Sequence, residues 1–290
     1  MQDNSNEIKI LISLLDDPDD TVYTGVRDQL FIHGAAAIPF LEEAWETVTD
    51  DMTCYRIEII LQGIQKETLY SEMDTWVSMG GTDLLAGALL LSRFHFNGLK
   101  DKETIQQAGQ LTQDLWLEMN PKLTPLEKVK VLNHVFFDIH GFSSVLNPNP
   151  PLNELLVHEV LKRKRGHPLT LGILYLMMAQ SMHLPMLGVD IAGHFATAWI
   201  NQPVHSLTWP VPEKFIDFYV NAPIKGSVFT HLNIQTFLEK QSLQPKSSYF
   251  MPISNTAAIK LLADRIMKVY VRDDDTDRAE QFRIFLTVFD

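Results

Sequence analysis

The sequence predicts an α+β protein that is mainly helical, with a small antiparallel sheet in its second half. Two observations support this prediction. Apolar residues recur at helical spacing over most of the 290 residues, whereas three short segments rich in β-branched and aromatic residues gather between positions 186 and 219. Because these predicted strands follow one another and do not alternate with helices, the order disfavours a parallel α/β sheet.

The composition is that of a folded, acidic globular protein. The chain has 36 acidic and 24 basic residues, a net charge of −12, and 46% hydrophobic residues. This balance disfavours a nucleic-acid partner, since phosphate binding depends on basic surface. A single cysteine, Cys54, excludes an intrachain disulfide and a cysteine-based zinc cluster. The ten histidines are scattered, so we expect neither a metal nor another cofactor.

One uncharged segment, 166–189, follows the basic run 162–165 and superficially resembles a membrane anchor. Its apolar block covers only 171–179 and is bracketed by Pro168 and Pro185. A membrane span needs about 20 predominantly apolar residues, so a buried helix is the better interpretation. No secretory signal is visible at the start of the chain. We therefore expect a soluble, cytoplasmic protein without a membrane span.

The first 80 residues are predicted to form helices joined by short acidic or glycine turns. An Asp-Pro break at 16–20 ends a first amphipathic helix, and Thr21 is the expected cap of a second. Gly34 closes that helix, and a third follows from Ile38. The order of helix, Asp-Pro break, helix and glycine resembles a HEAT-type repeat, of which one clear copy is present.

Helical periodicity continues through the middle of the chain and predicts helices within 55–94, 102–118, 125–139 and 152–165. The helix over 125–139 begins after Thr124, and the Asn-Pro run at 147–151 is a firm break. The basic run that ends the last of these helices has two interpretations. It is a nucleic-acid or localisation patch, or it is cationic charge at a helix C-terminus with Gly166 in the cap position. The net charge favours the second.

A helix over 168–182 without charged residues is predicted to be buried on most faces. Three strands follow it, at 186–191, 195–200 and 214–219. Two amphipathic helices, separated by the acidic run 273–275, close the chain.

The residues that could support chemistry form one constellation. The sequence lacks a glycine-rich phosphate loop, a His-Glu-x-x-His motif and a Gly-x-Ser-x-Gly elbow. What remains is a helix N-terminus at 166–170, a strand that bears His194 and a following strand that bears Asp217. A nucleophile at a helix N-terminus would be activated by a strand histidine, which an aspartate would orient. The expected thiol is missing.

These motifs resemble the SirB-type branch of the transglutaminase-like superfamily. The resemblance lies in the segments Val-Leu-Lys-Arg-Lys-Arg-Gly-His-Pro-Leu-Thr-Leu-Gly-Ile-Leu-Tyr-Leu at 160–176, Leu184-Pro185, Gly193-His194-Phe195 and Phe215-Ile216-Asp217, with support from Asn133-His134-Val135-Phe136-Phe137 and Gly141-Phe142. It implies a papain-like core with a central helix and a small antiparallel sheet. The implied domains are HEAT-like helices at 1–80, the transglutaminase-like core at 81–240 and a tetratricopeptide-like helix pair at 241–290.

Competent relatives in the superfamily use a Cys–His–Asp triad for acyl transfer or peptide hydrolysis, and the resemblance implies that His194 and Asp217 match its histidine and aspartate. The segment 166–172 contains no cysteine. Depending on a two-residue choice of alignment, the nucleophile position is held by Pro168, which has no nucleophilic atom, or by Thr170, whose hydroxyl is far less acidic than a thiol.

Each of these residues also has an interpretation without catalytic function. His194 and Asp217 could form a hydrogen-bonded pair that serves only the fold, and Thr170 could donate a structural hydrogen bond at the start of its helix. His167 is expected to be an exposed turn residue. Cys54 lies in a helical pattern typical of a buried, structural thiol.

Three functions stay open. The favoured one is a non-catalytic, degenerate transglutaminase-like protein that binds a protein or peptide segment and retains Thr170, His194 and Asp217 as a vestigial site. The alternative is a hydrolase or acyl transferase that uses His194 and Asp217 with an atypical nucleophile. The third is a purely structural or oligomerising helical scaffold.

Overall fold

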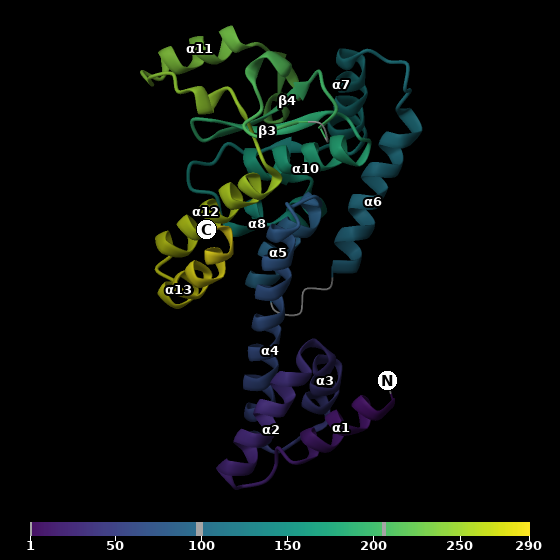
Figure 1. Ribbon diagram of the computed structural model, residues 1–290, viewed down its shortest axis with the longest axis vertical. Coiled ribbons are helices and arrows are strands. Elements are labelled where there is room, and N and C mark those ends of the chain that lie inside the picture. Colours follow the sequence, from purple (N-terminus) through teal and green to yellow (C-terminus); the bar gives the residue numbers. More distant parts are fainter. Residues whose placement is uncertain (1, 97–100, 205–206) are drawn as a thin grey trace. The chain divides into compact units, whose positions relative to one another are not determined.

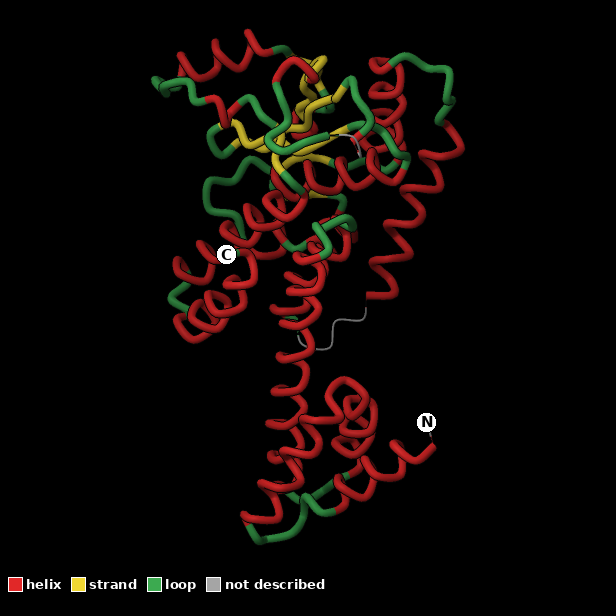
Figure 2. The backbone as a smooth tube through the Cα atoms, in the orientation of Figure 1, coloured by secondary structure: helices red, strands yellow, loops and turns green. Residues whose placement is uncertain are grey.

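The computed structural model describes residues 2–96, 101–204 and 207–290. It is mainly helical, with one small antiparallel sheet (Figure 1 and Figure 2). The chain divides into two compact units. The first contains Met1–Thr75 and Arg93–Gly98, and the second contains Trp76–Ser92 and Leu99–Asp290.

The described helices are, in chain order, α1 (Gln2–Ser13), α2 (Asp20–His33), α3 (Ile38–Thr47), α4 (Asp51–Ser78), α5 (Leu84–His95), α6 (Asp101–Glu118), α7 (Pro125–Asn133), α8 (Leu152–Leu155), α9 (Val157–Arg163), α10 (Pro168–Ser181), α11 (His231–Lys240), α12 (Asn255–Arg272) and α13 (Thr276–Phe285). The predicted helical start, the buried central helix and the closing helix pair are all present. Helix α11 was not predicted.

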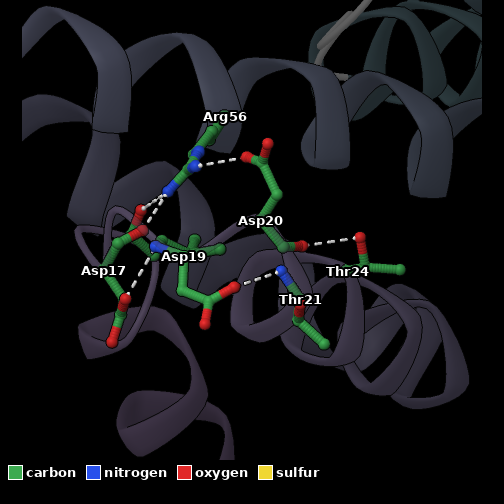
Figure 3. Close-up of polar contacts among 7 residues, drawn as sticks. Asp17, Asp19, Asp20, Thr21, Thr24 and Arg56 are labelled. Atoms are coloured by element: carbon green, nitrogen blue, oxygen red, sulfur yellow. Dashed lines mark hydrogen bonds and ion pairs between the residues drawn. The ribbon is translucent and has the colours of Figure 1, made fainter.

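In the first unit, a buried arginine ties helix α4 to the turn between α1 and α2 (Figure 3). The guanidinium of Arg56 donates to the carbonyl oxygens of Leu15 and Asp17 at 3.0 and 2.6 Å. It also lies 3.3 Å from the Asp20 carboxylate. Because the turn's backbone oxygens lose water when the helices pack, this fork of donors satisfies groups that would otherwise be costly to bury.

Some helix ends differ from the sequence-based expectation. Asp19 caps α2 by accepting from the Thr21 N–H, so Thr21 is the capped residue and not the cap. Helix α7 begins directly after Thr124, as predicted, and Thr124 forms a capping box with Glu127. The helix expected before Gly166 is broken into α8 and α9. The left-handed residue that ends α9 is Lys164 (φ 57°), whereas Gly166 belongs to a short strand.

The sheet has five strands in the order β6-β5-β4-β3-β7, and each neighbouring pair is antiparallel. The strands are β3 (Met186–Ile191), β4 (His194–Ile200), β5 (Ile216–Asn221), β6 (Ser227–Phe229) and β7 (Pro252–Ile253), and a separate parallel pair is formed by β1 (Ser143–Ser144) and β2 (Arg165–Gly166). Strand β5 starts and ends two residues later than the predicted strand 214–219. Strands β6 and β7 were not predicted.

Helices α10 and α11 cover opposite faces of this sheet (Figure 1). On the α10 face, the Phe195 ring packs so closely against Gly172 that an added Cβ would lie 2.4 Å from it. On the other face, Ala198 belongs to an apolar cluster with Ile234 and Leu238 of α11. The alternation of side chains along β4 therefore assigns successive residues to the two layers.

Helix α10 is the buried central helix that the sequence predicts. Its residues from Leu169 to Ala179 are all buried. Within the described ranges, no helix is long and apolar enough to cross a membrane.

Candidate functional site

A cavity of about 990 Å³ lies in the second unit, beside the N-terminus of α10, the β3–β4 turn and helix α11. Strands β1 and β6 also contribute residues to its walls. Most of its lining is apolar, with aromatic rings from Phe137, Phe142, Phe229 and Phe237. Concave, largely apolar sites with a few polar groups are typical of ligand binding.

His194 lines this cavity from the first position of β4. Its side chain is exposed, and its imidazole meets the Phe237 ring edge-on at a centroid distance of 5.0 Å. The neighbouring Phe195 points toward α10, so alternation directs His194 to the α11 face of the sheet. His194 and the start of α10 thus line one cavity from different layers.

Thr170 does not line the cavity. It is fully buried, and its hydroxyl donates to the Leu155 carbonyl oxygen at 2.9 Å. Pro168, the first residue of α10, does line the cavity. Of the two candidate nucleophile positions, the one that meets the cavity therefore has no nucleophilic atom.

Asp217 lies far from His194 along the sheet. It is exposed, and its carboxylate accepts from the Asn201 side-chain amide at 3.1 Å. Because Ile216 pairs with Ile200 at the end of β4, Asp217 and His194 are separated by roughly 17–20 Å at about 3.3 Å per strand residue. The structure does not bring this histidine and this aspartate together.

Asn221 is the residue of β5 that reaches the cavity. Val220 pairs with Thr197, so the same register places Asn221 opposite Ala196, near the start of β4. Sequence reasoning missed it because the predicted strand stopped at 219. The Asn-Ala-Pro sequence that ends the strand, typical of a turn, is the signal that could have moved this boundary.

His167 is buried, not the exposed turn residue that the sequence predicts, and it lines the cavity. It caps α10, because its Nδ1 accepts from the Leu169 N–H at 3.2 Å. Burial, helped by the nearby Arg265 cation, lowers the pKa of His167 to about 4. The imidazole is therefore neutral near pH 7, as an accepting cap requires.

This cap predicts a pH-dependent contribution to stability. Because the pKa of His167 falls from 6.5 to about 4 on folding, the unfolded chain binds the extra proton between these values. The contribution is complete above pH 6.5 and is lost as the pH falls toward 4, by about 2–3 kcal/mol. A His167→Asn variant keeps a capping oxygen but does not titrate. We expect its free energy of unfolding, measured by urea denaturation, to fall less than the native value between pH 7 and pH 4. If the free energies of unfolding of the two proteins fell in parallel between pH 7 and pH 4, His167 would not be the group that titrates.

A hydrogen-bonded latch holds one wall of the cavity. The Tyr175 hydroxyl of α10 donates to Asn133 Oδ1 at 2.7 Å, and Asn133 Nδ2 donates to the Gly226 carbonyl oxygen at 3.0 Å. Immediately after Asn133, the chain widens into a π-helix, His134–Ile139, which was expected to continue as an ordinary helix. Its Phe137 lines the cavity, consistent with the frequent placement of such turns at functional sites.

Other reactive groups lie elsewhere. Cys54 is in the first unit, partly buried, and its thiol donates to the Val48 carbonyl oxygen at 3.3 Å. It does not line the cavity. In the described part of the chain, no three His, Cys, Asp or Glu side chains are grouped so that they could hold a metal ion.

Comparison with protein families identifies a known domain in the central part of the chain. A family model of the transglutaminase-like superfamily matches residues 102–263, more than half of the chain. The matched region runs from α6 into α12 and includes the central helix, the sheet and the cavity lining except Arg265, which lies two residues beyond its end. The chain therefore belongs to the transglutaminase-like superfamily. No curated protein and no solved structure matches it significantly.

Proposed function

We propose that this protein is a non-catalytic member of the transglutaminase-like superfamily and that its cavity binds a peptide segment of another protein. The observation that carries the proposal is the position of Pro168 at the cavity, with the Thr170 hydroxyl already bonded to the Leu155 carbonyl oxygen. A site without an accessible hydroxyl or thiol at the helix start has no means of forming the acyl-enzyme on which triad chemistry depends.

The sheet edge supports a peptide as the ligand. Strand β6 ends the sheet, and in the described chain its one strand partner is β5. Ser227 and Phe229 of β6 both line the cavity. An extended peptide that enters the cavity could pair with this edge through its main chain, while the apolar walls receive its side chains.

The wider assignment is also part of this proposal. We place the chain in the SirB-type branch, with HEAT-like helices at 1–80, the core at 81–240 and a tetratricopeptide-like pair at 241–290. The three vestigial site residues of the sequence analysis then have structural roles. The Thr170 hydroxyl links α10 to α8 by its hydrogen bond to the Leu155 carbonyl oxygen. The His194 imidazole packs against the Phe237 ring. The Asp217 carboxylate accepts a hydrogen bond from the Asn201 side-chain amide.

Thiol accessibility tests the nucleophile position. Pro168→Cys places a thiol at the cavity and at a helix N-terminus, which lowers a thiol pKa, whereas Thr170→Cys places it in the packed core. In a Cys54→Ala background, we expect iodoacetamide to alkylate the Pro168→Cys protein at least tenfold faster than the Thr170→Cys protein. Faster reaction of the Thr170→Cys thiol would show that the nucleophile position is Thr170, and the proposal would lose its basis.

Function is tested by activity and by binding. The native protein should show no hydrolysis of fluorogenic peptide amides and no amine incorporation. It should retain peptides from a displayed library, and Ser143→Trp, which fills the cavity from β1, should abolish retention. Ser247→Trp is the control, because Ser247 is exposed outside the cavity. Peptide hydrolysis that disappears in His194→Ala would instead establish the alternative, an enzyme with an atypical nucleophile.

A further inference from the structure

The ionisable residues that line the cavity are all basic. Its described lining includes His167, His194, Lys225 and Arg265 but no aspartate or glutamate. The chain as a whole has twelve more acidic than basic residues. The permanent charges on the cavity lining, those of Lys225 and Arg265, are therefore both positive, opposite in sign to the net charge of the chain.

Arg265 is the most informative of these residues. It lies on α12 and is half-buried, and it has neither a hydrogen bond nor an ion pair with any described residue. Arg272, seven residues further along the same helix, pairs with Asp273. A partly desolvated guanidinium is costly without an anion, so an unpaired one at an apolar cavity indicates that the anion comes with the ligand.

Lys225 provides a second cation on a different element. It follows the short turn after β5 and is exposed, in a left-handed conformation with φ 49°. No ion pair holds it to a described carboxylate. Arg265 and Lys225 therefore line the cavity from α12 and from the β5–β6 connection.

We propose that the peptide bound in this cavity is acidic: it presents a carboxylate, from an Asp or Glu side chain or from its C-terminus, within an apolar segment. This inference rests on the proposed function. Apolar residues of the peptide would contact the aromatic walls, and its carboxylate would pair with Arg265, with Lys225 as the second cation. The bidentate geometry of arginine suits a carboxylate particularly well.

The test uses the full-length protein and a synthetic array of apolar hexapeptides with one variable position, made as free acids and as C-terminal amides. Fluorescence anisotropy of the retained peptides gives their affinities. We expect amidated peptides with Glu to bind about tenfold more tightly than those with Gln if the side chain supplies the carboxylate. If the C-terminus supplies it, free acids should exceed amides by a similar factor. Either preference should weaken at high salt.

Matched variants assign the preference to the cavity. Arg265→Gln should remove it, and Arg265→Lys should restore part of it. Lys268→Gln makes the same change in net charge at an exposed position of the same helix outside the cavity, and should leave the preference intact. Equal affinity of the native protein for acidic and neutral peptides would overturn this inference and leave the proposed function standing. Failure to bind any peptide would overturn the proposed function itself.

Discussion

Replacement of Leu174 by aspartate is expected to prevent the second unit from folding. Leu174 lies in the middle of α10 with 1% of its surface exposed, and the residues on either side of it are buried as well. No described cation is within reach along this helix, since α10 contains no charged residue. An unpaired carboxylate there costs several kcal/mol, which is comparable to the whole stability of a domain.

Two control variants separate the effect of changing the Leu174 side chain from the effect of burying a charge. Leu174→Met conserves the volume and should cost less than about 1.5 kcal/mol. Leu232→Asp introduces the same charge at a leucine of α11 that is 68% exposed, and should change stability by no more than about 0.5 kcal/mol. Circular dichroism and thermal denaturation of the purified proteins provide the measurement. A cooperative melt from soluble Leu174→Asp protein with native near-ultraviolet signal would refute the placement of this helix.

Gly226→Ala is expected to destabilise the second unit by about 4 kcal/mol, because it strains the backbone and breaks the latch at the cavity wall. Gly226 has φ 66°, and a Cβ there would lie 1.7 Å from Asn133 Oδ1. Asn133 could escape only by abandoning its hydrogen bonds to Tyr175 and to the Gly226 carbonyl. Burial raises the pKa of Tyr175, so its hydroxyl stays protonated and would be left as an unpaired donor.

Gly141→Ala isolates the contribution of backbone strain. Gly141 has a similar φ of 69°, but a Cβ there would meet nothing within 4 Å. We expect this substitution to cost about 1–2 kcal/mol, the left-handed penalty alone. Urea denaturation of the two variants and of Asn133→Ala gives the comparison. If Gly226→Ala and Gly141→Ala proved equally stable, the latch would have no energetic role, and the cavity wall would be held by packing alone.

Sequence periodicity predicts local structure well in this protein, because local structure follows from local chemistry. Spacing of apolar residues predicts helix α6, and Thr124 with Glu127 sets the start of α7 through a capping box. Uniformly apolar composition predicts that α10 is buried. These features depend on residues within a few positions of one another, so no knowledge of the rest of the chain is needed.

The site was much harder to predict, because a one- or two-residue difference in a strand or helix changes which side chains meet. The motif around His194 directs attention to the β3–β4 turn, where the cavity lies, but the sequence leaves Pro168 and Thr170 as alternative nucleophile positions. Choosing between the two required the tertiary partner of Thr170, which is the Leu155 carbonyl oxygen fifteen residues earlier. Asp217 is predicted from its place on the strand after His194 and from the resemblance of Phe215-Ile216-Asp217 to the family motif, but no local signal shows which end of β5 meets the cavity.

The sequence by itself therefore determined most of the helices but not α11, together with the buried central helix, the antiparallel β3–β4 hairpin and the absence of a cysteine from the start of α10. Only the tertiary structure decided that Pro168 rather than Thr170 meets the cavity, that Asn221 rather than Asp217 lies near the start of β4, and that Arg265 joins them from α12. The physical reason is the range of the forces involved. Helix caps and periodicity act over one or two turns, whereas strand register and cavity walls are set by packing between segments that are far apart in the chain.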